Sequence, residues 1–367
     1  MPFADQLINE STARSLVTTL ELALPPVELP TLKTAATRMD MLSLRERADL
    51  LRDALLEDLP GNYAAFVRSI RLASQNDAFR GWLIWPVTSA IATKAVAQGT
   101  AEAFDDAMAL LAELTGRLSA EFAIRTLLRH DLSRALQIIG GWTTSEDLDV
   151  RRLATEGTRP YLPWATRVPE ITEQPGVTIA VLDALYRDPE KYVRRSVANH
   201  LNDLSRDEPG LVVDTARGWL SDPDENTQRL VRHALRTLVK KGNAQALELL
   251  GFGPVSVEVT GPVLGRASIG FGQSIGFSAT LLNLADEPAR VAIDYTVYHR
   301  KANGGQTGKT FKLATRTLES GESFEVQRDH SFRAITTRRY HPGTHAISVQ
   351  VNGVESERAE FELLPEE

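Results

Sequence analysis

A short segment of the chain groups charged and aromatic side chains where a helix is expected to end. Glu156 is followed directly by Gly157, and Arg159, Pro160 and Trp164 come within the next eight residues. Glycine and proline disfavour a helix interior, so the chain should leave the helix here. Such loops carry functional residues more often than they pack a core. A carboxylate, a guanidinium and an indole at one helix exit therefore form the first candidate site.

Two further acidic residues, Asp203 and Glu121, lie on predicted helix faces that also carry arginine. Asp203 comes two turns after Arg195 on one face, and Glu156 comes one turn after Arg152. Glu121 is the weaker case, because a surface ion pair with the arginine four residues later would also explain it. Neighbouring guanidinium groups keep a carboxylate ionised. Fixed ionised carboxylates stabilise positive charge that develops during a reaction.

The composition predicts an ordinary soluble protein of more than one unit. A chain of 367 residues is longer than one compact hydrophobic core usually requires. Hydrophobic residues make up 43% of it, but no uninterrupted apolar run approaches the roughly 20 residues needed to span a membrane. The start of the chain lacks a secretion signal and there are no cysteines, so we expect a cytoplasmic protein without disulfides. The net charge of -7 argues against coating nucleic acid through bulk charge, although a local basic surface is compatible with it.

The hydrophobic pattern changes in kind at Gly251–Pro254. Before this segment apolar residues recur at helical spacing, and after it they alternate, as in Val255–Val259. We therefore predict two domains, a mainly α-helical one over residues 1–252 and an all-β one over residues 253–367. Short alternating runs separated by turn signals are typical of an immunoglobulin-like sandwich, which is the fold expected for the second domain.

The helical part contains an internal repeat. Asp188–Arg195 aligns with Asp222–Arg229 at an offset of 34 residues, and each copy begins with an Asp-Pro turn between two predicted helices. A third, less regular copy aligns Val150 with Val193. Helix pairs of this size bury their apolar faces only by stacking, which predicts a solenoid. The Asp-Pro turn before an arginine-bearing helix favours HEAT-like repeats over tetratricopeptide repeats.

The second helix of each copy has an apolar stripe and an opposite basic face. The outer faces of the two aligned copies carry four candidates for contact with a phosphate backbone: Arg195, Asn199, Arg229 and Arg232. Earlier in the chain the same reasoning places Arg125 outside, in line with Glu121 and Arg129. In a HEAT-like stack these faces would line a concave, arginine-rich trough suited to a phosphate backbone. The alternative is a solvated surface with local ion pairs.

These residues resemble the AlkC-type bacterial DNA glycosylases, relatives of AlkD in the HEAT-like group. The resemblance rests on Met1–Asp5, Ser119–Arg125, Glu156–Trp164, Val193–Asp203 and the appended immunoglobulin-like domain. It implies a monofunctional DNA glycosylase that removes alkylated, cationic bases such as N3-methyladenine from duplex DNA. It also implies that the damaged nucleotide is processed without being fully flipped out of the duplex. We expect the protein to be monomeric.

The chemistry of that reaction assigns roles to the candidate residues. A cationic base leaves readily, so the enzyme must chiefly stabilise the positive charge that develops on the sugar, as in glycoside hydrolysis. Asp203 and Glu156 are the candidates for this task and for handling the water, with Glu121 as a third. Trp164 is expected to face the sugar or the cationic base, where a cation–π contact favours the alkylated form. No metal and no cofactor is expected, because the histidines lack the neighbours of a metal site.

Phosphate contacts are assigned to Arg152 and Arg159 beside the carboxylates, and to Lys301 on the β-sandwich, which would close on the far side of the duplex. Two other functions stay open. The chain could be a HEAT-repeat adaptor that binds proteins, or a DNA-damage-binding protein without catalysis. The carboxylates favour an enzyme, because a scaffold has no need of Asp203 and Glu156 among arginines.

Overall fold

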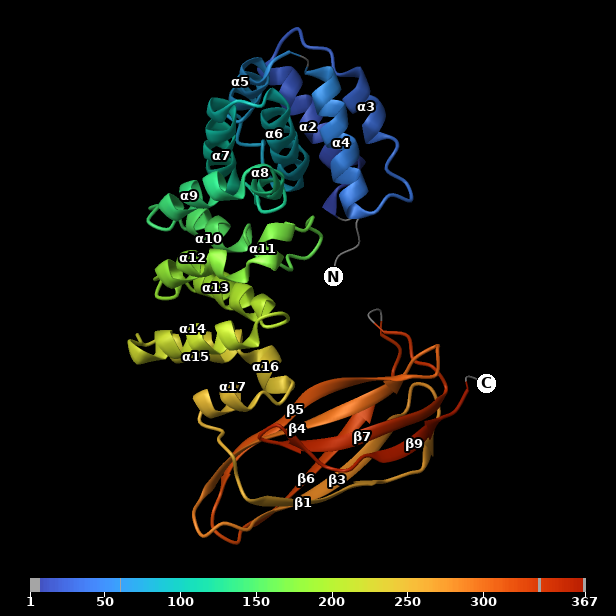
Figure 1. The fold of residues 1–367 in the computed structure, drawn as a ribbon. Coiled ribbons are helices and arrows are strands. Elements are labelled where there is room, and N and C mark those ends of the chain that lie inside the picture. The colour runs from blue at the N-terminus through green and yellow to red at the C-terminus, as the bar shows by residue number, and fades with distance from the viewer. Residues whose placement is uncertain (1–6, 60, 336–337, 366–367) are drawn as a thin grey trace. The chain divides into compact units, whose positions relative to one another are not determined.

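The computed structural model describes residues 7–59, 61–335 and 338–365, so the opening Met1–Asp5 lies outside the described residues. The chain divides into two compact units, Met1–Ala234 and Leu235–Glu367. The first is helical, and the second combines two short helices with β-strands (Figure 1). The order of a helical part followed by a β part is therefore confirmed. Within the described residues, no helix is both long enough and apolar enough to span a bilayer.

The helices of the first unit follow one another along the chain with short connections. They are α2 (Glu10–Ala23), α3 (Pro30–Ala36), α4 (Leu44–Asp58), α5 (Tyr63–Ala73), η1 (Gly81–Leu83), α6 (Ile84–Gln98), α7 (Ala101–Thr115), α8 (Ile124–His130), α9 (Leu132–Trp142), α10 (Leu148–Glu156), α11 (Pro169–Glu173), η2 (Pro175–Thr178), α12 (Ile179–Leu185), α13 (Lys191–Leu204), α14 (Pro209–Ser221) and α15 (Thr227–Ala234). Helix α10 packs against α13, and α13 packs against α15, so the second helices of the repeat copies are neighbours.

The apolar stripes predicted for these helices are confirmed. Val193, Val197 and Leu201 are fully buried along α13, because a spacing of three or four residues keeps them on one side of the helix. The second helix of the second repeat copy is short and begins at Thr227. It ends at Ala234, and a separate helix, α16 (Arg236–Lys240), follows in the second unit.

The Asp-Pro turn of the first repeat copy ties two helices together. The carboxylate of Asp188 accepts hydrogen bonds from Arg151 of α10, with Nε–Oδ2 and Nη2–Oδ1 distances of 2.6 and 3.2 Å. The same carboxylate accepts the main-chain N–H of Glu190 at 2.8 Å, at the start of α13. The turn thus satisfies the helix start and fixes α13 against α10. These two helices carry most of the acidic candidate residues.

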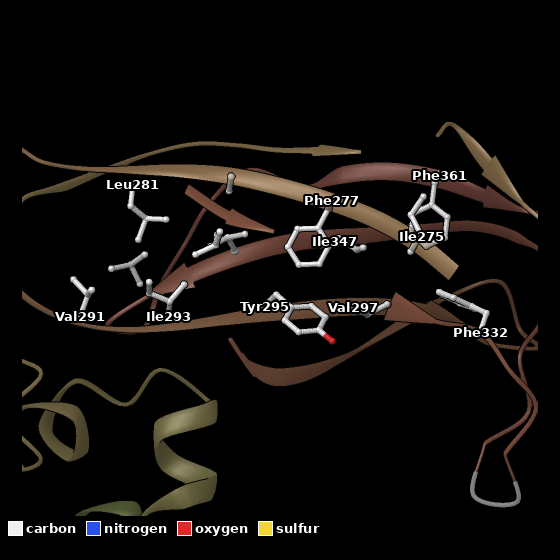
Figure 2. Packing of buried hydrophobic residues seen from close by; sticks show 14 of the residues in the cluster. Ile275, Phe277, Leu281, Val291, Ile293, Tyr295, Val297, Phe332, Ile347 and Phe361 are labelled. Atoms are coloured by element: carbon white, nitrogen blue, oxygen red, sulfur yellow. The ribbon is translucent and has the colours of Figure 1, made fainter. Parts of the chain in front are cut away.

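The second unit contains two sheets around one hydrophobic core. Its elements are α16, α17 (Ala244–Leu249), β1 (Val257–Leu264), β2 (Ser268–Ile269), β3 (Ser274–Asn283), β4 (Ala289–Arg300), β5 (Gln306–Leu318), β6 (Ser323–Ser331), β7 (Gly343–Val351), β8 (Val354–Glu355) and β9 (Ala359–Leu363). One sheet has the order β1-β3-β6 and the other β2-β9-β7-β4-β5, with β8 paired to β7. Phe277 and Leu281 of β3 face Ile293, Val297 and Ile347 of the other sheet in this core (Figure 2).

The boundary between the units lies earlier than the change in secondary structure. Helix ends at Leu249 and strand begins at Val257, on either side of the boundary expected between residues 252 and 253. The compact units divide before α16 because Leu247 of α17 and Phe252 pack against Ala292, on the face of β4 away from the sandwich core. The short helices therefore belong with the β-sandwich.

Candidate active site

The candidate site begins at the last residue of α10. Glu156 ends this helix and is 6% exposed. Gly157 follows, and a Cβ on it would lie 2.8 Å from Ile124 Cγ2 and 2.9 Å from the carbonyl oxygen of Leu153. Since real Cβ atoms do not approach other atoms so closely, only glycine fits at this helix exit. The predicted end of the helix is confirmed, and the main chain at this exit lies close to Ile124 of α8.

Arg159 joins the two principal carboxylates of the site. Its Nη1 donates to Glu156 Oε1 at 2.5 Å, and its Nε donates to Asp203 Oδ2 at 2.9 Å. All three side chains are largely buried, with exposed side-chain fractions of 9% to 11%. Asp203 comes from the last turn of α13, so the loop after α10 brings together residues from two helices. Charge-assisted hydrogen bonds of this kind hold both carboxylates in fixed orientations.

Arg152 and Glu121 extend this arrangement. Arg152 Nη1 donates to Glu121 Oε2 at 2.8 Å, and its Nη2 lies 3.9 Å from Glu156 Oε2. Glu121 also accepts the hydroxyl of Ser119 at 2.8 Å. We call Glu121, Arg152, Glu156, Arg159 and Asp203 the carboxylate–arginine cluster. Three carboxylates and two guanidiniums leave it with one formal negative charge.

A chain of buried polar groups supports Glu156 from behind. The Ser196 hydroxyl donates to Glu156 Oε2 at 2.6 Å and is itself hydrogen-bonded to the Thr155 hydroxyl. His200 Nδ1 lies 2.9 Å from the Thr155 carbonyl oxygen, and His200 Nε2 lies 3.0 Å from the Thr178 hydroxyl. Because a carbonyl only accepts, Nδ1 carries the proton and Nε2 accepts from Thr178. Complete burial lowers the pKa of His200 to about 3, so the ring is neutral.

The electrostatics of the cluster keep Glu156 ionised. Burial raises the pKa of Glu156, but the charges of Arg159 and Arg152 and the hydrogen bond from Ser196 outweigh this effect, and the pKa lies below its ordinary value. Burial lowers the pKa of Arg159, whereas Asp203 and Glu156 raise it above its ordinary value. The cluster can therefore present negative charge at neutral pH from a largely water-excluded position. Negative charge held in this way suits a cationic ligand or transition state.

Trp164 lies in the loop that follows the cluster. Its side chain is 43% exposed, which is unusual for a tryptophan, and its φ angle is +63°. A bulky residue in the left-handed region is strained by roughly 1–3 kcal/mol, and such strain persists only where the surroundings hold it. Arg45 of α4 supplies one restraint, since its Nε donates to the Trp164 carbonyl oxygen at 3.0 Å. Trp164 is therefore strained and exposed, and its contact with a ligand stays a prediction.

Two arginines in this region have positions that the sequence did not predict. Arg125, expected on the outer face in line with Glu121, is completely buried, so that expectation is wrong. Glu121 bonds to Arg152, and not to Arg125 as in the alternative explanation considered for it. The helix begins only at Ile124, and the loop after α10 covers Arg125. Arg45 was missed altogether, since its partner Trp164 lies 119 residues away and no local signal links them.

The predicted phosphate-binding residues fall into two groups. Arg152 and Arg159 lie in the cluster rather than on an open face, and their contact with phosphate stays a prediction. Arg195 and Arg229 are exposed and line a pocket of about 320 Å³ between α13 and α15. We call this the basic pocket; its described lining residues, none of them acidic, are Lys191, Arg194, Arg195, Ala198, Asn226, Arg229, Leu230 and His233.

The remaining predicted residues lie outside both the cluster and the basic pocket. Asn199 is half-buried on α13, where its Oδ1 lies 3.1 Å from His233 Nε2, and Arg232 is exposed on α15. Lys301 is exposed in the tight turn after β4, in the second unit, where its N–H donates to the Gly305 carbonyl. Among the residues that the structure describes, no three His, Cys, Asp or Glu side chains are grouped so as to hold a metal ion.

Comparison with known proteins gives consistent matches. The family model "Uncharacterised protein YhaZ, C-terminal Ig-like domain" matches residues 258–365. The chain is 31% identical over 323 residues to the uncharacterized protein YhaZ of Bacillus subtilis (strain 168), covering 88% of each chain. It is also similar to the solved structure of the Pseudomonas fluorescens alkylpurine DNA glycosylase AlkC bound to DNA containing an abasic site analog. That match has a TM-score of 0.86 and 34% identity, and it covers 99% of this chain and 100% of that chain.

These matches define the class of fold. A helical part followed by an immunoglobulin-like domain, superimposable along the whole chain, is the fold of a DNA-repair glycosylase. The chain belongs to the AlkC family.

Proposed function

We propose that this protein is an alkylpurine DNA glycosylase that hydrolyses the N-glycosidic bond of cationic bases such as N3-methyladenine in duplex DNA. The observation that carries the proposal is the double contact of Arg159, which fixes Glu156 and Asp203 in one site. The likeness to the P. fluorescens enzyme over the full chain supports it. An adaptor or scaffold would gain nothing from buried carboxylates held in this way.

The reaction needs charge stabilisation more than acid catalysis. An alkylated ring nitrogen already makes the base a cationic leaving group, so the barrier lies in the oxocarbenium-like sugar that forms as the bond breaks. A carboxylate that is ionised and fixed in advance stabilises this charge without reorganising. Asp203 and Glu156 fill this role, and either can orient the attacking water. By analogy with single oxyanion-hole donors, one such group contributes about 2.7–4 kcal/mol to the transition state.

The formal charge of the cluster matches a positively charged lesion. Its three carboxylates keep only about a tenth of their side-chain surface exposed, at 12% for Glu121, 9% for Glu156 and 10% for Asp203. Electrostatic attraction is stronger in such a water-poor environment than in bulk water. Trp164 offers an exposed ring to the sugar or the base, and a cation–π contact of about 0.5–2 kcal/mol would favour the alkylated form over a neutral base.

The helical unit would act as a HEAT-like solenoid that grips the duplex. The successive packing of α10, α13 and α15 supports this arrangement. The basic pocket would offer the exposed guanidinium groups of Arg195 and Arg229 to the phosphate backbone, and Lys301 of the β-sandwich would add a contact. The lesion would be processed without complete flipping, by a monomer that acts on bacterial DNA in the cytoplasm.

The test is the release of free N3-methyladenine from methylated duplex DNA. Wild-type protein should release the base, and Asp203→Asn should lower the single-turnover rate by about 10²–10³-fold while it keeps the side-chain shape. Asp214→Asn is the matched control, because Asp214 pairs with Arg217 on the exposed surface of α14. It should excise at the wild-type rate.

The outcomes separate the candidate functions. A wild-type protein that binds methylated duplex in a salt-dependent manner but releases no base would be a DNA-damage-binding protein, and one that binds no duplex would be an adaptor. Either result overturns the proposal. An Asp203→Asn variant as active as Asp214→Asn would leave the function standing and remove Asp203 from the site.

A further inference from the structure

Arg125 is a buried arginine whose hydrogen bonds go to main-chain carbonyls of one loop. Its guanidinium is completely buried in the first turn of α8. Nη1 donates to the carbonyl oxygens of Gly157 at 3.0 Å and Arg159 at 2.9 Å, and Nε donates to the carbonyl oxygen of Thr166. All three acceptors belong to the loop after α10. One side chain thus holds both ends of the loop, 157 and 166, as well as residue 159 between them.

This loop carries the residues on which the candidate site depends. The side chain of Arg159 joins Glu156 to Asp203, so a shift of the Arg159 main chain would move the contacts of both carboxylates. Trp164 is held in a left-handed conformation between Arg159 and Thr166, and Arg45 restrains its carbonyl from another helix. Arg125 and Arg45 therefore restrain main-chain atoms on both sides of the strained tryptophan.

A contribution to the stability of the fold does not by itself explain a buried cation at this position. Burial lowers the pKa of Arg125 to about 10, and the nearby charges of Arg167, Arg159, Arg129 and Arg45 lower it as well. The group stays protonated at neutral pH, and the hydrogen bonds from its Nε and Nη1 all go to main-chain carbonyls. A buried cation without a carboxylate is costly. Only a guanidinium offers several donors in one plane, and here its Nε and Nη1 serve three carbonyls of the loop, while Nη2 has no hydrogen-bond partner among the described residues.

We propose that Arg125 is a positioning residue of the active site, which fixes the loop 157–166 so that Arg159 and Trp164 meet the alkylated nucleotide in a productive geometry. This inference rests on the proposed glycosylase function. It predicts that loss of Arg125 slows bond cleavage and leaves the affinity for DNA unchanged, because the basic pocket lies on α13 and α15. A displacement of about 1 Å at a catalytic group costs on the order of 10²-fold in rate.

The matched control is Arg47 of α4. It is also buried, at 8% exposed, and it also donates to main-chain carbonyls, those of Leu42 and Ile8, each at 2.9 Å. Neither acceptor belongs to the loop after α10. Arg47→Met and Arg125→Met remove the same buried group, so a merely structural role predicts the same behaviour for both.

The first experiment measures single-turnover excision of N3-methyladenine, affinity for duplex DNA with an abasic-site analogue, and thermal stability. Both variants should melt at lower temperature than wild type. Well below the melting temperature, Arg125→Met should excise about 10²-fold more slowly with unchanged affinity, whereas Arg47→Met should excise at the wild-type rate. Equal rates for the two variants would overturn the inference.

Chemical rescue keeps the inference testable if Arg125→Met folds poorly. Methylguanidinium, at concentrations well below those that unfold the protein, should restore part of the rate of Arg125→Ala, because it can reoccupy the space and bind the same carbonyls. It should not accelerate wild type or Asp203→Asn. Arg125→Lys, which keeps the charge but not the planar set of donors, should stay slow. A fully active Arg125→Lys would show that charge alone matters and would overturn the role as a clamp.

A readout without catalysis separates this inference from the proposed function. In protein labelled with fluorotryptophan, the ¹⁹F resonance of Trp164 is identified by its disappearance in Trp164→Phe. It should shift or broaden in Arg125→Met and stay unchanged in Arg47→Met. An unchanged resonance in Arg125→Met would contradict the inference. If wild type released no base, the proposed function would fail, and the resonance would still report whether Arg125 holds the loop.

Discussion

Two groups of arginines on neighbouring helices differ in their surroundings. Arg152 and Arg159 lie largely buried between carboxylates in the carboxylate–arginine cluster. Arg195 and Arg229 are exposed in the basic pocket, whose described lining contains no acidic residue. Arginine side chains therefore occur in two different environments. In the cluster its charge orients ionised carboxylates, and in the pocket it stays available for an anion.

From this difference we expect separate tasks for the two regions. Groups that are buried, paired and aimed in advance stabilise charge in a transition state. Exposed cations provide salt-dependent affinity for a phosphate backbone, and such contacts do not distinguish one base from another. Substitutions in the cluster should therefore change stability and the rate of bond cleavage, and substitutions in the pocket should change affinity alone.

The largest expected effect is on the stability of the cluster. Arg159→Met removes the partner of two buried carboxylates, and breaking such a pair costs about 3–5 kcal/mol of unfolding free energy because charge is left buried and unpaired. Arg229→Met is the matched change in the basic pocket, where an exposed substitution should stay within about 0.5 kcal/mol. Urea unfolding followed by circular dichroism measures both. Similar decreases for the two variants would contradict the distinction between the regions.

The second expected effect is a pH dependence of the unfolding free energy that arises from His200, which lies behind the carboxylate–arginine cluster. Burial lowers the pKa of His200 from 6.5 to about 3, so below pH 6.5 the unfolded chain binds a proton that the folded chain does not. Stability therefore falls as the pH falls, by about 1.4 kcal/mol per unit and roughly 2.7 kcal/mol by about pH 4.5. His200→Asn keeps a donor and an acceptor but cannot take up this proton.

The measurement compares the unfolding free energy of wild type and His200→Asn at several values between about pH 7.5 and pH 4.5. The variant should be less stable at neutral pH, and the difference should shrink or reverse in acid. Two curves that run parallel would show that His200 does not titrate as its burial requires. Arginines of the basic pocket keep their charge over this range, so Arg229→Met should follow the wild-type curve.

Much of the helical architecture could be predicted, because it follows from local periodicity. The buried stripe of Val193, Val197 and Leu201 needs only 3.6 residues per turn, and the helix exit after Glu156 needs only its glycine. The change to alternating apolar and polar residues likewise predicted the β-strands of the second unit. The early end of α15 at Ala234 was not predictable in this way, since the apolar pattern continues through Leu238 while the helix does not.

The sequence could indicate residues of the candidate site, but it could not predict the contacts between them. Periodicity placed Asp203 on the polar face of α13, yet it is 7% exposed because Arg159 reaches it from a loop 44 residues away in the sequence. Periodicity also placed Arg125 outside, because a helical pattern tells which face is polar and not which loop will cover it. The contact of Arg45 with Trp164 joins residues 119 apart and depends wholly on the tertiary fold.

The smallest expected effect lies in the basic pocket and completes the contrast. Removing one phosphate-binding cation lowers the slope of log K against log salt concentration by about 0.9, so Arg195→Gln and Arg229→Gln should each flatten the salt dependence of duplex binding by roughly this amount. The weakening should be equal for methylated and undamaged duplex, since phosphate contacts do not read the base. Single-turnover excision at saturating protein should keep its wild-type rate.

Arg217→Gln is the matched control for this last effect, because Arg217 is exposed on α14 and paired with Asp214 outside the basic pocket. It should leave the salt slope unchanged. Asp203→Asn should also leave the slope unchanged while it slows excision, which is the reverse of the behaviour expected for the pocket arginines. If Arg195→Gln slowed excision at saturation as Asp203→Asn does, the pocket would take part in the chemistry, and the division of labour between the two groups of arginines would be wrong.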